Sequence, residues 1–410
     1  MRMNKKKEIA PKLRFPEYIG NNLKITKLGK ISSIVKEKAG ENEYTLMSVT
    51  SGVGLIPQAE KFGREIAGDS YKNYIVIKKY DFAYNKSATK QFPEGYISML
   101  EKFDIAAVPN SIFTCFRITD NEAYPPFFDY LWHNNYHGHW LRKYIEVGAR
   151  AHGALSVDTK HLWSMPLALP DFNEQQKIAD CLSSIDDLID AESRKLKTLE
   201  KYKKGLMQKL FPAEGKTLPE WRFPEFRGKS EWRIKPLGKI CTNYDSRRIP
   251  ITEKDRVKGE IPYIGASGVI DYINDFIFDE DLLCVSEDGA NLVARTYPIA
   301  FSISGKTWVN NHAHVLKFSH NYTQNIVESY LNMINLQDFL TGMAQPKLNR
   351  AKLDIIPIPL PEEEEQQKIA DCLSEIDTMI KEQSNKVEQL KAHKKGLMQG
   401  LFLFLEEADV

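Results

Sequence analysis

Features that mark membrane, secreted or zinc-binding proteins are missing from this chain of 410 residues. It has no run of about 18 uncharged apolar residues, and the basic opening MRMNKKKEIAPK is not followed by the apolar stretch of a signal peptide. The five cysteines are widely spaced and form no CxxC pair, which argues against a disulfide framework and against a thiolate zinc site. We therefore expect a cytoplasmic protein with reduced thiols.

An excess of charge of one sign is missing too. The 56 Lys and Arg and the 55 Asp and Glu leave a formal net charge of +1, so the overall charge does not indicate a polyanionic partner. Any nucleic-acid surface must come from local clusters of basic residues, and we expect the lysines at 5–7 to be one phosphate-contacting candidate. With 42% hydrophobic residues, the chain can form two or three folded domains.

Motifs of catalysis are not found. Gly305-Lys306-Thr307 lacks the first glycine of a phosphate-binding loop, because that position is Ala300. Tyr124-Pro125-Pro126-Phe127 is close to the motif with which amino-methyltransferases hold the target amino group, but Tyr124 stands where Asn or Asp is required. We expect no catalytic residue in this chain.

Three histidines could in principle bind a metal ion, since His133 and His137 are spaced for one helix face and His139 follows closely. Apart from Asp129, no nearby carboxylate or cysteine completes a ligand set. Hydrogen-bonding or surface histidines are the commoner outcome for such a pattern, and we expect no metal site.

The chain does contain a copy of part of itself, and a repeat constrains the architecture before any motif does. Residues 174–211 read EQQKIADCLSSIDDLIDAESRKLKTLEKYKKGLMQKLF and residues 365–402 read EQQKIADCLSEIDTMIKEQSNKVEQLKAHKKGLMQGLF, identical at 24 of 38 positions. RFPEY at 14–18 likewise matches RFPEF at 222–226, and DYL at 129–131 matches SYL at 329–331, where each half is expected to have a short helix. The middles between these segments share almost nothing. The sequence thus predicts a duplicated scaffold carrying two unlike domains.

Both long repeats carry apolar residues at the a and d positions of about five heptads, which predicts two coiled-coil helices. Polar residues interrupt the two seams at equivalent places, Glu192 with Lys203 and Gln383 with Lys394, and are expected to fix the register. Because the first helix delivers the chain to the second middle, we expect antiparallel pairing within the chain; pairing with other chains is the alternative. The predicted seam consists of Ile178, Leu182, Ile185, Ile189, Leu196 and Leu199, and of Ile369, Leu373, Ile376, Ile380, Val387 and Leu390.

Each middle has short β-branched and aromatic runs separated by Gly, Asn and Asp turns, such as residues 74–77 and 111–116 in the first and 282–285 and 314–318 in the second. This pattern predicts an α+β domain with a curved sheet and one or two helices. Basic residues mixed with amides and aromatics lie in the turn-rich segments, and these types contact base edges and phosphates. The predicted DNA contacts are Lys61, Arg64, Lys72, Tyr84, Asn85, Lys86 and Lys90 in the first middle, and Arg247, Arg248, Lys306, Trp308, Asn310, Asn311 and His312 in the second.

Together these features resemble the specificity subunit of type I restriction-modification systems over nearly the whole chain. The resemblance is carried by LALP at 167–170 and IPLP at 358–361 leading into EQQKI, by the KKGLMQ repeats and by the RFPE openings. Two more passages look like the family, from residues 259–266 through 311–313 and from residues 46–50 through 84–85. The lead-in at 153–158 departs from the family's pattern, whereas residues 342–349 fit it.

The resemblance implies an α+β fold with an internal pseudo-twofold repeat, in which two globular target recognition domains are separated by two long antiparallel coiled-coil helices. The expected boundaries are an N-terminal segment at 1–23, the first recognition domain at 24–168, the first spacer helix at 169–212, a linker at 213–231, the second recognition domain at 232–359 and the second spacer helix at 360–404.

The resemblance also implies a function. Each recognition domain would read one half of a bipartite asymmetric site in double-stranded DNA, and the helices would set the spacing and dock two methyltransferase subunits, joined by two restriction and motor subunits. S-adenosylmethionine, ATP and Mg would be bound by those partners, and no cofactor by this chain. The alternatives are a stand-alone DNA methyltransferase or nuclease, and a coiled-coil scaffold without a DNA role.

Overall fold

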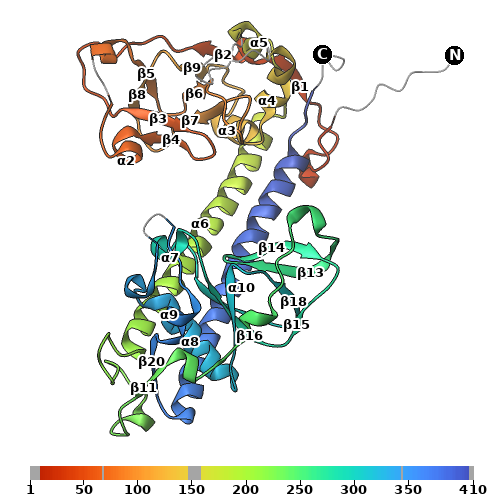
Figure 1. Ribbon diagram of the computed structural model, residues 1–410. Helices are drawn as coiled ribbons and strands as arrows, with labels where there is room; N and C mark the ends of the chain where they lie inside the picture. The colour runs from red at the N-terminus through yellow and green to blue at the C-terminus, as the bar shows by residue number, and fades with distance from the viewer. Residues whose placement is uncertain (1–9, 67–68, 146–157, 343–344, 406–410) are drawn as a thin grey trace, which may run out of the picture. The chain divides into compact units, whose positions relative to one another are not determined.

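The computed structural model describes residues 10–66, 69–145, 158–342 and 345–405. The chain divides into two compact units, of which unit 1 contains residues 1–191 and 386–410 and unit 2 contains residues 192–385 (Figure 1). The lysines at 5–7 and the lead-in at 153–157 lie outside the described residues. Each unit combines small antiparallel or mixed sheets with helices, which confirms the prediction of an α+β protein with two repeated domains.

Unit 1 is built on a four-stranded antiparallel sheet in the order β2-β9-β6-β7. Its strands are β2 (Ser32–Ile34), β6 (Phe82–Asn85), β7 (Tyr96–Met99) and β9 (Phe113–Ile118). The paired strands are β1 (Lys24–Lys27) with β10 (Pro166–Leu169), β3 (Met47–Thr50) with β4 (Gly54–Pro57), and β5 (Ile75–Lys78) with β8 (Ile105–Val108). The helices are α1 (Leu28–Ile31), α2 (Gln58–Phe62), α3 (Pro125–His133), α4 (Tyr136–Leu141) and α5 (Thr159–Trp163), with 3-10 turns at Pro16–Tyr18, Asp69–Asn73 and Arg142–Tyr144.

Unit 2 contains two four-stranded sheets, in the orders β12-β19-β16-β17 and β14-β13-β18-β15. The strands are β11 (Arg233–Pro236), β12 (Thr242–Asn243), β13 (Lys258–Gly265), β14 (Gly268–Ile273), β15 (Phe278–Asp279), β16 (Leu282–Ser286), β17 (Ala300–Ile303), β18 (Lys306–Val309), β19 (Ala313–Lys317) and β20 (Pro357–Leu360). The helices are α7 (Asn291–Ala294), α8 (Asn321–Met333) and α9 (Arg350–Asp354), with 3-10 turns at Pro224–Phe226, Leu237–Lys239, Asp245–Arg247, Glu253–Asp255 and Gln337–Phe339. Helices α3 and α8 confirm the short helix predicted in each half.

Two long helices, α6 (Phe172–Leu210) and α10 (Glu363–Leu401), each begin in one unit and end in the other. The core of unit 1 takes Ile178 and Leu182 from the start of α6, and it takes Met398 from the end of α10. The core of unit 2 takes the residues at the equivalent repeat positions, Ile369 and Leu373 from α10, with Met207 of α6 packed against them. Each globular core is therefore completed by the beginning of one long helix and the end of the other.

Helices α6 and α10 contact each other in both units. Along these contacts the residue numbers rise on α6 as they fall on α10. In unit 1, the Lys394 ammonium donates to both oxygens of Asp186 at 2.6 Å. In unit 2, Gln383 Nε2 donates to Glu192 Oε2 at 2.6 Å and Lys203 Nζ to Asp377 Oδ1 at 2.5 Å. All four polar interruptions of the seam are thus engaged in hydrogen bonds. The twelve seam residues are buried or half-buried, and none of them is exposed.

The RFPE openings lie against the starts of the long helices. The Arg14 guanidinium donates two hydrogen bonds of 2.7 Å to the Glu174 carboxylate, and Arg222 donates two of 2.7 and 2.6 Å to Glu365. All four side chains are 10% exposed or less. Bidentate pairs of this kind are among the strongest hydrogen bonds in proteins, so each repeat is closed by the same buried clasp.

The chain reaches the two clasps differently. In unit 2, α6 continues through the linker to the second RFPE segment, and the Trp221 amide donates to the Lys209 carbonyl at 2.9 Å. The equivalent positions in unit 1 are Leu13 and Gly400, which belong to opposite ends of the chain, and the Leu13 amide donates to the Gly400 carbonyl at 2.9 Å. In unit 2 the linker thus connects the two hydrogen-bonded positions covalently. In unit 1 the equivalent hydrogen bond joins the two ends of the chain.

Candidate nucleic-acid interface

The predicted DNA contacts of unit 1 lie on two segments, at 61–72 and 85–90. Lys61, Arg64, Lys72 and Lys90 are exposed, Lys86 is half-buried, and Lys72 is ion-paired with Glu41 at 2.6 Å. Both segments reach β3, because Lys61 Nζ donates to Ser48 Oγ at 3.4 Å and Asn85 Nδ2 donates to the Val49 carbonyl at 3.5 Å. The recognition surface of unit 1 stays a prediction.

The prediction that Tyr84 contacts DNA is wrong. The side chain is 1% exposed, and its hydroxyl donates to the Glu94 carbonyl at 2.8 Å. Burial raises the pKa of Tyr84. The run Phe82-Ala83-Tyr84 is buried on both faces of β6, so the ring that looked available in the sequence is part of the core.

In unit 2, the structure brings the predicted residues together. The Arg247 guanidinium lies over the rings of Tyr244 and Phe278, 4.6 and 4.7 Å from their centroids. Phe278 pairs with Thr307 across β15 and β18, which places Arg247 beside the strand that carries Lys306 and Trp308. Arg247 Nη1 donates to Glu280 Oε1 and its Nη2 to the Ile277 carbonyl, both at 3.3 Å. A guanidinium stacked on aromatic faces keeps its planar donors oriented, and its remaining donors suit contact with a base edge or a phosphate.

Two neighbours extend this surface. The Lys306 ammonium lies 4.7 Å from the centroid of the Phe276 ring, and Trp308 Nε1 donates to the Ile249 carbonyl at 2.6 Å. The hydrogen bond from Trp308 ties β18 to the segment that follows Arg248. Arg247 and Lys306 are therefore exposed cations held by aromatic rings on adjoining strands and turns, and we name the surface formed by Arg247, Lys306, Trp308, Asn311 and His312 the unit 2 loop cluster.

Arg248 supports this cluster from below, because its side chain is only 13% exposed. Its Nη1 donates to Glu287 Oε2 at 2.7 Å, to the Ala313 carbonyl at 2.8 Å and to the Asn311 carbonyl at 3.4 Å. These bonds hold the loop between β18 and β19. Arg248 was predicted to contact DNA directly, and in this arrangement its donors are directed into the protein.

Asn310 is also buried, with 5% exposure, and its side-chain oxygen accepts a hydrogen bond from the His312 amide at 2.8 Å. The prediction that it contacts DNA is wrong, since the amide shapes the loop from inside. His312 itself is exposed, and its Nδ1 lies 2.9 Å from Asp288 Oδ2. Asn311 is exposed at the tip of the same loop.

A buried histidine that sequence reasoning missed lies under the loop. His314 is 1% exposed, with Nδ1 2.6 Å from Asp245 Oδ2 and Nε2 2.7 Å from the Leu348 carbonyl. Both of these oxygens are hydrogen-bond acceptors, so a ring that carries a proton on each nitrogen satisfies both at once. His314 thus joins the turn at Asp245–Arg247, strand β19 and the segment before α9.

The carboxylates around His314 are held ionised. Burial opposes the charge of Asp245, but the hydrogen bond with His314 and the Val315 amide outweigh it and lower the pKa of Asp245. For Glu287, burial is again outweighed, here by the hydrogen bond from Arg248 and by the charge of His314, and the pKa is lowered. A buried charged network of this kind fixes the geometry of what it supports.

A cleft of about 1450 Å³ opens in unit 1, lined by α3, by loops of the sheet and by parts of α6 and α10. Its wall carries Asp186 bound to Lys394, and Tyr130 donates to Asp186 at 3.0 Å. Burial raises the pKa of Asp129 at its floor, where the carboxylate accepts from the Met99 amide at 2.9 Å. The lining holds the carboxylates of Glu101, Asp129, Asp180, Asp186 and Asp190 and the ammonium groups of Lys12, Lys391, Lys394 and Lys395. These charges nearly balance, so they do not single the cleft out as a DNA groove.

Within the part of the chain that the structure describes, no three His, Cys, Asp or Glu side chains are placed to hold a metal ion. Burial raises the pKa of the thiols of Cys115 and Cys284, which keeps them unreactive. No helix in the same part of the chain is long and apolar enough to cross a membrane.

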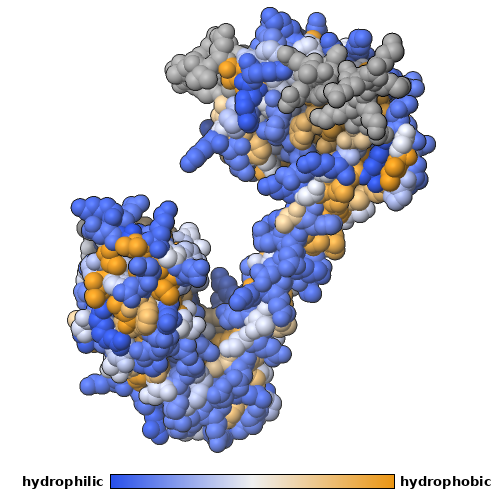
Figure 2. Space-filling model, turned by 90° about the vertical axis from the view of Figure 1, so that its right-hand side faces the viewer, coloured by the Kyte–Doolittle hydropathy of each residue, from blue (hydrophilic) through white to orange (hydrophobic). Residues whose placement is uncertain are grey.

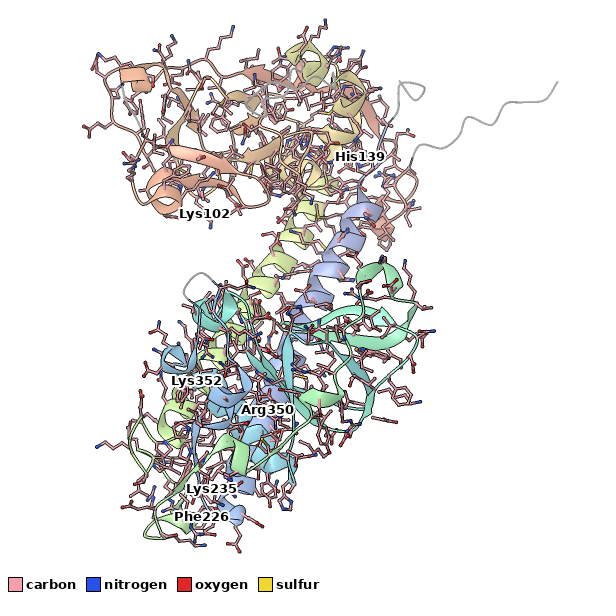
Figure 3. All side chains as sticks on the ribbon, viewed as in Figure 1. Lys102, His139, Phe226, Lys235, Arg350 and Lys352 are labelled. Atoms are coloured by element: carbon pink, nitrogen blue, oxygen red, sulfur yellow. The ribbon has the colours of Figure 1, made fainter. Side chains whose placement is uncertain are left out.

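Further surface features lie outside the predicted set. Figure 3 labels basic side chains that sequence reasoning did not single out, namely Lys102 in unit 1 and Lys235, Arg350 and Lys352 in unit 2. Lys102 and Arg350 are exposed. Apolar side chains also gather on a face of unit 2 (Figure 2), and the exposed ones on β14 include Val269, Ile270 and Tyr272. An apolar patch fits a protein partner better than it fits phosphates.

Comparison with known families decides the identity of the scaffold. Residues 30–201 and 229–391 both match the type I restriction modification DNA specificity domain, which accounts for most of the chain. This chain belongs to that family. The matched segments contain Glu174 and Glu365 but neither Arg14 nor Arg222, so they include each clasp only in part. They cover both unlike middles, and the type I specificity family that the repeats and motifs resemble is confirmed.

Two relatives that match parts of the chain are named as specificity subunits of the same family. The chain is 33% identical over 153 residues to a type I restriction enzyme specificity subunit of Haemophilus influenzae, covering 37% of this chain and 39% of that protein. It is 26% identical over 284 residues to the type I restriction enzyme MjaVIII specificity subunit of Methanocaldococcus jannaschii, covering 62% of this chain and 65% of that protein. The matches span less than two thirds of either relative's length.

A solved structure shows the same fold. The crystal structure of the S subunit of a type I restriction-modification system from M. genitalium aligns with 97% of this chain and 100% of its own, with a TM-score of 0.61 and 14% sequence identity. At that identity the similarity concerns the fold alone.

Proposed function

We propose that this protein is the non-catalytic DNA-reading subunit of a type I restriction-modification complex, and that each unit reads one half of a bipartite asymmetric site. The observation that carries the proposal is the contrast between scaffold and middles. The clasps Arg14–Glu174 and Arg222–Glu365 agree bond for bond, whereas the sheets that they carry differ in strand order. Two unlike binding surfaces on one repeated frame suit an asymmetric site with two unlike halves.

In this proposal α6 and α10 form an antiparallel coiled coil that sets the distance between the two half-sites and docks two methyltransferase subunits. Charge supports the antiparallel direction. Residues 172–192 hold six acidic and one basic residue and residues 193–210 hold one acidic and seven basic, while residues 363–383 hold seven acidic and two basic and residues 384–401 hold one acidic and four basic. Antiparallel pairing brings acidic halves against basic halves, which a parallel pair would not do.

The chemistry belongs to the partners in this proposal. Methyltransferase subunits with S-adenosylmethionine flip the target adenine out of the duplex and modify it, and two restriction and motor subunits use ATP and Mg. This chain selects the place. The function requires contact with the chromosome, in keeping with a cytoplasmic location.

Sequencing of modified bases in a host with and without this gene tests the proposal. We expect one bipartite methylated motif to disappear when the gene is deleted and the partner genes are kept. A motif that persists would contradict the proposal. Methylation by the purified chain alone would instead support a stand-alone methyltransferase, and an unchanged methylome would support a scaffold without a DNA role.

The spacer role has its own test. Four residues inserted at equivalent positions of both long helices add about one helical turn, or about 6 Å at 1.5 Å per residue. The unread gap of the motif should then widen, and the half-site sequences should stay the same. An active complex with an unchanged gap would show that the helices do not set the spacing.

A further inference from the structure

The outer face of α6 in unit 2 carries four cations in a row. Arg194, Lys197, Lys201 and Lys204 are all exposed, and at 3.6 residues per turn they fall within an arc of about 80°. Lys203, which bonds Asp377 of α10, lies about 140° around the helix from the centre of this arc. The row, which we name the α6 stripe, therefore faces away from α10.

The stripe has no acidic counterpart of its own. Among the residues that the structure describes, none of the four cations is ion-paired with a carboxylate, whereas Lys177 is paired with Glu17 and Lys368 with Glu225. An unpaired row of like charges costs self-repulsion, which a bound polyanion would relieve.

The second copy of the scaffold lacks the stripe. The equivalent positions of α10 are Asn385, Glu388, Ala392 and Lys395, with a net charge of zero in place of four positive charges. The two copies are identical at 24 of 38 positions, so the fold does not require these cations. They distinguish one copy of the frame from the other.

We propose that the α6 stripe binds the phosphate backbone of DNA, as a sequence-independent contact that only one side of the bipartite site receives. The inference rests on the proposed function, because it assumes that the complex engages a duplex. The stripe runs from Arg194 to Lys204, a span of ten residue steps or about 15 Å at 1.5 Å per residue. A duplex lying along it presents about four phosphates of one strand over that length, at 3.4 Å of axis each.

An acidic protein surface is the competing occupant, and the composition of the stripe disfavours it. Lysine is depleted at protein interfaces, which place aromatic and apolar anchors at their centre. The arc between Arg194 and Lys204 holds no apolar side chain, and the exposed Tyr202 lies outside it. Lysine as a flexible point charge is a common ligand of phosphate.

The duplicated scaffold supplies the test substitutions. Arg194→Asn, Lys197→Glu and Lys201→Ala introduce the residues that α10 already carries at the same positions, so the helix is expected to fold as before. The triple variant removes one, two and one units of charge, four in all. Lys391→Glu with Lys395→Glu removes two and two units from α10 and is the matched control.

The full-length chain, assembled with its methyltransferase partners, is titrated with a duplex that carries its methylated motif at several salt concentrations. We expect the slope of log K against log salt to fall in magnitude by about 3 in the triple variant, since each lost phosphate contact removes about 0.9, and to stay unchanged in the control. Discrimination between the motif and a scrambled duplex should be kept.

Three results would overturn the inference. An unchanged slope in the triple variant would exclude phosphate contact, and failed assembly of that variant with the methyltransferase subunits would assign the stripe to a protein partner. An equal fall of the slope in the control would mean that general charge, rather than the stripe, carries the effect. Failure of the proposed function looks different, because the wild-type complex would then not distinguish the motif from the scrambled duplex.

Discussion

The two units use the same frame and close it differently. In unit 2 the clasp Arg222–Glu365 follows a covalent linker from the end of α6, whereas in unit 1 the clasp Arg14–Glu174 must gather the two ends of the chain, with the Leu13 to Gly400 hydrogen bond in place of the linker. In unit 1 the ion pair therefore holds together segments that no linker joins. The comparison separates what the repeat specifies, the contacts of the frame, from what chain connectivity adds.

The largest effect should come from breaking the clasps. Arg14→Ala leaves the Glu174 carboxylate buried without its partner, and Arg222→Ala does the same to Glu365; both glutamates are 1% exposed. Each variant should lose about 3 to 5 kcal/mol of stability. In the first variant the N-terminal segment also loses its anchor, while in the second the linker still holds the segment in place. We expect equal losses in urea unfolding but early proteolysis near the N-terminus in Arg14→Ala alone.

The reciprocal variants Glu174→Gln and Glu365→Gln are the controls for this prediction, since they keep the size of the side chain and weaken the same bonds. Equal proteolysis of the two arginine variants would mean that the linker adds nothing to the closure of unit 2.

The next largest difference should be in acid, where unit 1 should lose stability at a higher pH than unit 2. Burial lowers the pKa of His137 in unit 1 to about 4, against about 6.5 in an unfolded chain. The unfolded chain therefore binds the extra proton between these values, and unit 1 loses stability as the pH falls from about 6.5 toward 4. The loss from pH 7 to pH 5 is about 2 kcal/mol. In unit 2, the lowered pKa of Asp245 gives stability that is lost only in stronger acid, as the pH falls below about 4.

Urea unfolding followed by a probe in each unit at pH 7 and pH 5 measures this difference. His137→Gln should remove the acid-induced loss of stability in unit 1 and leave unit 2 as it was, because the raised pKa of Asp129 acts in the opposite direction. If unit 2 weakened first, the assignment of the acid-sensitive group to His137 would be wrong.

A smaller and one-sided effect is expected at the unit 2 loop cluster. His314→Leu leaves the Asp245 carboxylate and the Leu348 carbonyl without their donor, which costs about 1 to 2 kcal/mol. The loop at 310–313 should shift, and the half-site read by unit 2 should lose discrimination while the other half keeps it. His314→Gln offers a single amide donor and should recover part of the discrimination.

The base-modification profile of both half-sites is the measurement for these His314 variants. Loss of both half-sites to the same degree would reduce His314 to a general stability residue.

The smallest effects belong to the ion pairs of the long helices. Lys394→Met and Lys203→Met remove equivalent pairs, with Asp186 and Asp377, that are partly solvated. Each should cost about 0.5 to 1 kcal/mol, and less at high salt. A marked difference between the two variants in thermal unfolding would show that the frame is less symmetric than its contacts indicate.

The frame could be predicted from the sequence because its signals are local and repeated. The heptad seam predicts α6 and α10, and the matched DYL and SYL segments predict α3 and α8. The RFPE and EQQKI motifs were visible as repeats, yet their partnership was not, since Arg14 and Glu174 are 160 residues apart. Only the fold shows that one motif closes on the other.

The candidate interface was predictable only in outline, since burial decides which polar residues can reach DNA. Tyr84 and Asn310 lie in turn-rich segments like their exposed neighbours, but packing on both faces of β6 buries the one and the shape of the β18–β19 loop buries the other. His314 sits in an apolar strand run and meets Asp245 from 69 residues away, so no spacing rule could find the network.

Exchange of one middle tests the central claim most directly. Residues 24–165 of this chain are replaced by the equivalent segment of another family member with a different motif, and the methylated bases of the host are sequenced. The account predicts a hybrid motif, with one half-site changed, the other kept and the gap preserved. A motif changed in both halves, with the exchanged complex still active, would contradict it.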